Sequence, residues 1–171
     1  NLGDDIVSTG LWPDQLDALD PMQAAAFQRR YVEGARTLLR PGTTHAFDKM
    51  LITWQWLPAV ACVLPGAVGL HMARDPRDMA VSLFLSNFHP LGMGWTASLE
   101  GIRRVTAAER SLLPQALDTL GIPHETVVYE NLVANPAATV ERCLKRMGLP
   151  MHPAVLEPER NTRTVHTLSH D

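Results

Sequence analysis

The stretch GLHMARDPRDMAVS, residues 69–82, changes from a strand pattern to a helix pattern within a few residues. Residues 67–73 are short, apolar and bounded by proline and glycine turns, which predicts a buried strand. Asp75 followed by Pro76 is typical of a helix N-cap and first helical position. We therefore expect a helix from Asp75 to about Phe88.

Two arginines and a serine lie where this strand ends and the helix begins: Arg74, Arg77 and Ser82. Ligands of open parallel sheets bind beyond the carboxyl ends of strands, where the next helix offers unpaired N–H groups. An arginine fork matches a phosphate, and Ser82 can add a hydroxyl, so the junction suits a dianion. By spacing alone, a plain junction is favoured, in which Asp75 and Asp78 form a capping box and the arginines are solvated.

The remaining chain predicts helices that alternate with a few short strands. We expect helices over 20–40, 52–64, 75–88, 97–120 and 135–147, and strands over 45–48, 67–73 and 125–129. Pro58 and Pro114 should break or kink their helices, and residues 89–94 should form a loop. This alternation predicts an α/β domain with a parallel sheet and crossover helices, although the strands are too few for a complete sheet.

Composition excludes several classes of protein. The 171 residues carry a net charge of -3 with no Lys/Arg-rich block, so a nucleic-acid partner or an anionic membrane surface is not expected. No apolar run approaches the ~18 residues of a membrane span. Cys62 and Cys143 are predicted to be reduced core residues of a cytoplasmic protein. The seven histidines lack zinc-site spacing, so no metal is expected.

Three segments resemble the sulfotransferase family. ARDPRDMAVS (73–82) resembles the segment that binds the 3′-phosphate of the sulfuryl donor. FDKM (47–50) resembles the DKMP-type segment of bacterial sulfotransferases, which are often attached to tetratricopeptide repeats, and of the related tyrosylprotein enzymes. VVYENLVANPAATVERCLKRMGLP (127–150) resembles the YEDLVADP segment with its following helix. The segments follow the family's order and cover about residues 41–150.

The resemblance implies a P-loop-NTPase-like domain of three layers around a parallel sheet. It implies transfer of a sulfuryl group from PAPS (3′-phosphoadenosine 5′-phosphosulfate) to a hydroxyl or amine by in-line displacement, without a metal. By the family's motifs, Lys49 assists the leaving group, Arg74 and Ser82 hold the 3′-phosphate, and Tyr129 contacts adenine. Glu130 is interpreted as structural, paired with an arginine or capping nearby backbone.

The family's PRSGTT-like phosphosulfate loop does not occur in the chain. PGTTHAF (41–47) lies too close to Lys49, and Leu51 stands where small-molecule sulfotransferases have a histidine base. We therefore expect a partial domain over 1–171, with an irregular lead-in (1–19), a core (20–150) and a C-terminal loop region (151–171). The phosphosulfate-loop strand, a C-terminal segment and the general base would lie outside it, so the chain as given should be an inactive fragment.

Two other functions stay open from the residues. One is a nucleotide phosphotransferase or kinase of P-loop-like fold, and the other is a non-catalytic interaction domain on the same scaffold. The acceptor of a sulfotransferase also stays open among carbohydrate, peptide tyrosine, lipid and small molecule. Tetratricopeptide repeats on the parent chain would fit the resemblance.

Overall fold

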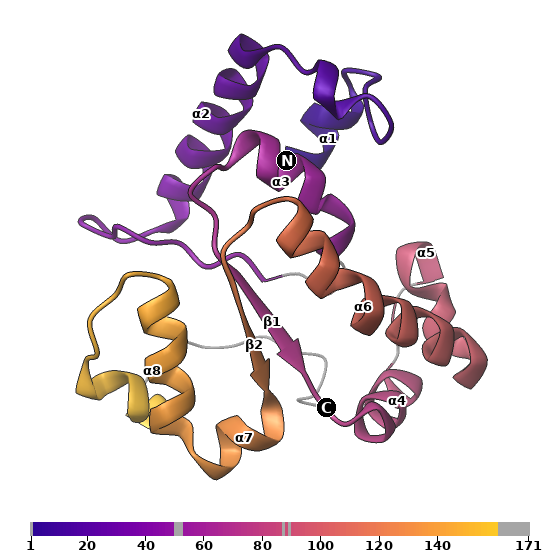
Figure 1. Ribbon diagram of the computed structural model, residues 1–171, viewed down its shortest axis with the longest axis vertical. Helices are drawn as coiled ribbons and strands as arrows, with labels where there is room; N and C mark the ends of the chain where they lie inside the picture. The colour runs from indigo at the N-terminus through magenta and orange to yellow at the C-terminus, as the bar shows by residue number, and fades with distance from the viewer. Residues whose placement is uncertain (1, 50–52, 87, 89, 161–171) are drawn as a thin grey trace. The chain divides into compact units, whose positions relative to one another are not determined.

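The computed structural model describes residues 2–49, 53–86, 88 and 90–160 (Figure 1). The chain divides into two compact units. Unit 1 comprises Asn1–Ala67 with Ala116–Ile122, and unit 2 comprises Val68–Gln115 with Pro123–Asp171. Unit 1 is helical in its described residues, whereas unit 2 contains a sheet.

Unit 1 packs its helices around a small apolar core. Its helices are α1 (Leu2–Val7), α2 (Pro21–Leu38) and α3 (Leu57–Val63), with single 3-10 turns at Leu16–Ala18 and Thr53–Trp56. Buried in this core are Ile6, Leu16, Ala59 and Val63. The rings of Trp12 and Trp56 stack beside it with centroids 4.5 Å apart.

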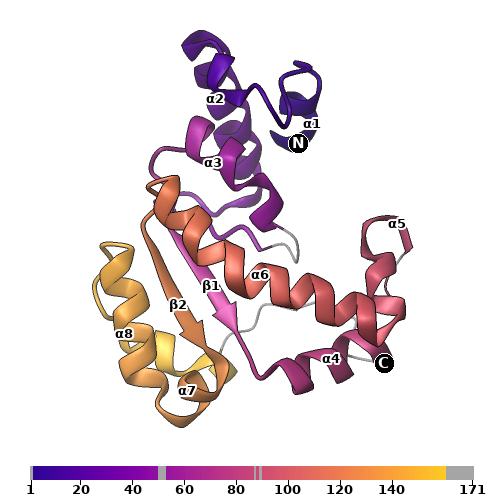
Figure 2. The same cartoon turned by 45° about the vertical axis from the view of Figure 1, so that its right-hand side comes forward.

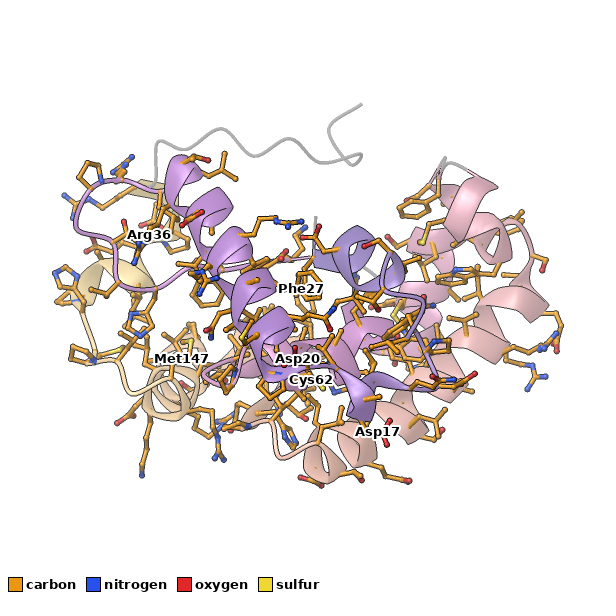
Figure 3. The ribbon with its side chains drawn as sticks, turned by 90° about the horizontal axis from the view of Figure 1, so that it is seen from above. Asp17, Asp20, Phe27, Arg36, Cys62 and Met147 are labelled. Carbon is orange, nitrogen blue, oxygen red and sulfur yellow. The ribbon has the colours of Figure 1, made fainter. Side chains whose placement is uncertain are left out.

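Helix α2 begins and ends as the sequence predicts. Asp20 is the N-cap and accepts a hydrogen bond of 2.9 Å from the N–H of Met22, and Pro21 is the first helical residue. Arg36 lies in the last turn, at the other end of the helix from Asp20 (Figure 3). An acid at the start and a base at the end both suit the helix dipole.

Three expectations for unit 1 are wrong, and the one for Pro58 is confirmed. The lead-in 1–19 contains α1 and a 3-10 turn, because Ile6 and Leu16 supply half of the buried core cluster. The strand expected over 45–48 is absent, since 43–49 are neither helix nor strand and have no neighbouring strand to pair with. Pro58 lies in the first turn of α3 and separates it from the preceding 3-10 turn, as expected. Cys62 is exposed rather than buried.

Unit 2 holds two parallel strands that follow the prediction closely. Strands β1 (Gly69–Ala73) and β2 (His124–Val128) pair in register, from Gly69 opposite His124 to Ala73 opposite Val128. Figures 1 and 2 show both arrowheads pointing the same way, toward the starts of α4 (Pro76–Leu85) and α7 (Tyr129–Ala134). The described residues therefore form a mixed helix-and-strand fold with a small parallel sheet, as an α/β class requires.

The region between the strands is more helical than expected. Helix α5 (Pro90–Met93) and a 3-10 turn (Gly94–Ala97) replace part of the predicted loop. Helix α6 (Leu99–Thr119) runs on through Pro114, where a break was expected. Leu113 and Leu117 are buried on either side of that proline. Their burial favours a continuous helix despite the missing backbone hydrogen bond.

Helix α8 (Pro136–Arg146) packs against β2 with both ends as predicted. Asn135 is its N-cap and accepts a hydrogen bond of 3.3 Å from the N–H of Ala138. Gly148 takes the positive φ of 68° that follows many helices. Short 3-10 turns at Pro153–Leu156 and Pro158–Arg160 follow. None of the helices in the described part of the chain has the length and hydropathy needed to cross a membrane.

Candidate functional site

The candidate site in unit 2 lies just beyond the ends of the paired strands. Because Ala73 and Val128 are opposite each other, the next residues, Arg74 and Tyr129, leave the sheet at the same level. Asp75 and Glu130 follow them in the same way. Two segments that are 55 residues apart in sequence are thus brought side by side by the register.

Arg74 and Tyr129 are in direct contact. The guanidinium carbon of Arg74 lies 4.9 Å from the centre of the Tyr129 ring, which is cation–π geometry. The side chain of Arg74 is 42% exposed and Tyr129 is 43% exposed, so both remain accessible to a ligand. The ring therefore supports one face of the guanidinium and leaves its N–H groups available at the edges.

Glu130 binds the backbone of the opposite strand end. Its Oε1 accepts a hydrogen bond of 2.9 Å from the N–H of Asp75. This bond is the main reason why the pKa of Glu130 is lowered. The capping interpretation of Glu130 is therefore correct, and its partner is the N-cap of α4.

Asp75 and Arg77 form a closed pair at the start of α4. Asp75 Oδ1 accepts from the N–H of Arg77 at 2.8 Å, which caps the helix. The Arg77 fork donates to the same carboxylate, from Nε at 3.1 Å and from Nη2 at 2.7 Å. These bonds lower the pKa of Asp75 to about 2 and raise the pKa of Arg77. Arg77 is thus engaged by a carboxylate within its own turn.

Asp78 does not act as the capping-box acid that its spacing predicts. Its carboxylate lies 3.5 Å from Nη2 of Arg74, while the N–H of Asp75 goes to Glu130. The capping-box expectation failed because an acid from the other strand end takes the donor. The contact with Arg74 is long and exposed, and such pairs contribute little to stability. Asp78 therefore holds Arg74 only loosely.

The charged side chains at the junction differ in how firmly a partner holds each of them. Two cations and three anions give the junction a net charge of -1: Arg74, Arg77, Asp75, Asp78 and Glu130. Asp75 neutralises Arg77, and the Glu130 carboxylate is bound to a backbone N–H. Arg74 is the cation of this group whose carboxylate contact is loosest.

Ser82 lies about two turns into α4 with its side chain exposed. Its carbonyl accepts hydrogen bonds from the N–H of Ser86 at 3.1 Å and from the Ser86 hydroxyl at 2.7 Å. Within the ranges that the structure describes, its own hydroxyl makes no hydrogen bond. Ser82 therefore follows Arg74 on one continuous segment, but no direct contact joins the two side chains.

Lys49 belongs to unit 1 and is described there by itself. Its side chain is exposed and forms no ion pair with the described residues. The preceding carboxylate, Asp48, accepts a hydrogen bond of 2.9 Å from the Tyr31 hydroxyl of α2. Burial, together with this bond to Asp48, raises the pKa of Tyr31 to about 12. Leu51, the position discussed for a base, lies outside the described residues.

His71, in the middle of β1, is a half-buried polar residue that the sequence patterns did not single out. Its Nδ1 is buried and has no hydrogen-bond partner among the described residues. Burial lowers the pKa of His71, and the nearby positive charges of His124 and Arg110 add to this effect. In the described part of the chain, no group of three or more His, Cys, Asp or Glu side chains is placed to hold a metal ion.

Comparison with protein families gives one match. The family model described as "Sulfotransferase family" matches residues 8–153, which include Lys49, Arg74, Ser82 and Tyr129. No curated protein and no solved structure matches the chain. The match covers most of the chain and agrees with the three motifs at residues 47–50, 73–82 and 127–150. The chain therefore belongs to the sulfotransferase family.

Proposed function

We propose that this domain belongs to a PAPS-dependent sulfotransferase in which the junction after β1 and β2 binds the 3′-phosphoadenosine end of the donor. The observation that carries the proposal is the contact of Arg74 with Tyr129 beyond the paired strand ends. A fork for a phosphate and a ring for a base then lie next to each other, as the two ends of a 3′-phosphoadenosine require.

The 3′-phosphate is held in this proposal by Arg74 and Ser82. Arg74 exchanges its long contact with Asp78 for a phosphate, which is a stronger acceptor and carries about two negative charges. Ser82 adds a hydroxyl donor from α4, and the positive end of that helix favours the same anion. Tyr129 contacts adenine through the part of its ring that Arg74 leaves open.

The proposed reaction is an in-line displacement at sulfur. The acceptor oxygen forms a new bond to sulfur while the bond from sulfur to the 5′-phosphate oxygen breaks. That oxygen leaves with the electron pair as part of PAP (3′-phosphoadenosine 5′-phosphate), and the acceptor proton passes to a general base. Lys49 offsets the charge that grows on the departing oxygen. The hydrogen bond from Tyr31 to Asp48 supports this role, because it restrains the residue before Lys49.

We further propose that β1 and β2 are part of a larger P-loop-like parallel sheet in the parent protein. Among the described residues, β1 and β2 each have one edge without a neighbouring strand, and parallel sheets are usually larger and covered on both faces. Met72 on β1 is 54% exposed, as expected for a strand that lacks part of its cover. The missing strand would carry the phosphosulfate loop. A cytoplasmic location and an acceptor that bears a hydroxyl complete the proposal.

Calorimetric titration of the full-length protein with PAP and with AMP tests the proposal. The two ligands share adenine, ribose and the 5′-phosphate, so they differ only in the group that Arg74 should hold. We expect PAP to bind roughly ten- to a hundredfold more tightly, which is the usual gain from a charge-assisted hydrogen bond. Arg74→Ala should abolish the preference and leave AMP binding unchanged.

Arg146→Ala is the matched control, because it removes the same charge from an exposed position in the last turn of α8. It should keep the preference for PAP. Equal binding of PAP and AMP by the unmodified protein would overturn the proposal in favour of the other two functions. A kinase-like phosphotransferase would then bind ATP with Mg²⁺, and an interaction domain would bind neither nucleotide.

A further inference from the structure

We propose that Glu130 is a positioning residue: its hydrogen bond to the N–H of Asp75 orients Arg74 for the 3′-phosphate. This inference rests on the proposed function, since it concerns the same phosphate contact. It adds a residue that touches no ligand and acts through the backbone of the opposite strand end.

The bond restrains the peptide that joins Arg74 to Asp75. Glu130 Oε1 accepts from the Asp75 N–H at 2.9 Å, and this N–H belongs to the peptide plane immediately after Arg74. The pairing of Ala73 with Val128 holds the chain just before Arg74, so holding the plane after it restrains the backbone angles of Arg74 and hence the direction in which its side chain leaves the backbone. The adjacent residue, Tyr129, supports the Arg74 guanidinium at 4.9 Å. Consecutive residues after β2 therefore restrain both the backbone and the side chain of Arg74.

The start of α4 shows why Glu130 is needed. The N–H of an N-cap residue is commonly bound by an acid three residues later in the same helix. Here that acid, Asp78, lies beside Arg74 instead, at 3.5 Å from Nη2. When a phosphate displaces Asp78 from Arg74, the Glu130 bond still holds the backbone. The hydrogen bond from Asp75 to Glu130, just after β2, thus keeps Arg74 in place while a phosphate replaces Asp78 beside it.

Electrostatics and positioning predict opposite effects for Glu130. A carboxylate near a dianion site repels the ligand, so charge alone predicts tighter PAP binding when Glu130 is removed. Loss of the hydrogen bond predicts weaker PAP binding, because Arg74 must then be ordered on binding. Variants that separate the charge of Glu130 from its acceptor therefore decide between the two effects.

Three variants of the full-length protein make this separation, each titrated with PAP and AMP by calorimetry. Glu130→Gln removes the charge and keeps an acceptor oxygen, so it should keep or slightly increase the preference for PAP. Glu130→Ala removes the acceptor, and Glu130→Asp keeps the charge but shortens the side chain. Both should lower the preference for PAP by about three- to tenfold, the range of one hydrogen bond. Glu141→Ala, at an exposed position of α8, is the control and should change nothing.

Hydrogen exchange at the Asp75 amide, followed by NMR, reports directly on the hydrogen bond from Asp75 to Glu130 in the absence of ligand. Exchange should be faster in the Ala and Asp variants and near normal in the Gln variant. If the unmodified protein does not prefer PAP, the proposed function fails and this inference fails with it. If PAP is preferred but the Ala and Asp variants keep the full preference, only the role of Glu130 is overturned. A loss of preference in the Gln variant equal to that in Ala would also overturn it, because the retained acceptor oxygen would then make no difference to Arg74.

Discussion

His71 places a buried polar nitrogen in the middle of β1, and this residue should make the stability of the protein depend on pH. Burial, with the charges of His124 and Arg110, lowers the pKa of His71 in the folded state. In the unfolded chain the imidazole regains a pKa near its ordinary value of about 6.5. Below that pH the unfolded state binds more protons than the folded state, so acid favours unfolding.

We predict that the free energy of unfolding is highest above about pH 6.5 and falls as the pH drops toward 5. One group contributes at most about 1.4 kcal/mol per pH unit, and less when it is half-buried. Urea denaturation at several pH values should give a shallower slope for His71→Phe than for the unmodified protein. His45→Ala, an exposed histidine of unit 1, is the control and should retain the original slope. Equal slopes for all three proteins would contradict the assignment to His71.

At the level of single residues, the sequence places Arg74 and Tyr129 at the ends of their strands but does not predict the partners of the residues around them. The Arg74 spacing and the Tyr129 position follow from short motifs, and the register of β1 and β2 explains why the two meet. The bond from Glu130 to Asp75 spans 55 residues, and the bond from Tyr31 to Asp48 spans 17. Neither has a local pattern, because both depend on how distant segments pack. Asp78 is the opposite case. Its spacing predicts a local bond to the N–H of Asp75, but the distant Glu130 accepts from that N–H instead.

At the level of elements, helix ends marked by a capping residue and a proline were located well. The side chains of Asp20, Asp75 and Asn135 all accept a backbone N–H at the start of their helices. These bonds are local, so three or four residues of sequence determine them. Elements that depend on packing were located less well. Helix α6 continues through Pro114 between two buried leucines, and residues 45–48 lack the partner that a strand requires.

Asn135 provides a test of capping at the start of α8. Its Oδ1 accepts from the N–H of Ala138 at 3.3 Å, and the residue is exposed. Asn135→Ala should lower the free energy of unfolding by about 1 kcal/mol, the usual cost of losing an N-cap. Asn135→Asp keeps the acceptor and should stay close to the unmodified protein in urea denaturation. An Ala variant as stable as the Asp variant would show that the cap contributes nothing here.

At the level of the whole molecule, alternating helix and strand patterns correctly predicted a mixed helix-and-strand fold with a parallel pair of strands, which is compatible with an α/β class. Family membership followed from three motifs in order, and the family match over residues 8–153 confirms it. The division into two units was not predicted, because apolar periodicity identifies faces of elements without saying which faces share a core. Lys49 and the junction at Arg74 fall in different units. Their joint role in catalysis therefore stays a proposal.

The role proposed for Arg74 is to recognise a phosphate at the 3′ position rather than negative charge in general. The most direct test compares binding of the 3′,5′- and 2′,5′-bisphosphates of adenosine to the full-length protein by calorimetry. The two isomers carry the same base, sugar and charge, so a diffuse electrostatic attraction binds them equally. A clamp built on Arg74 predicts at least about a tenfold preference for the 3′ isomer, which Arg74→Ala removes. Equal affinities, or a preference that survives in Arg74→Ala, would contradict the claim.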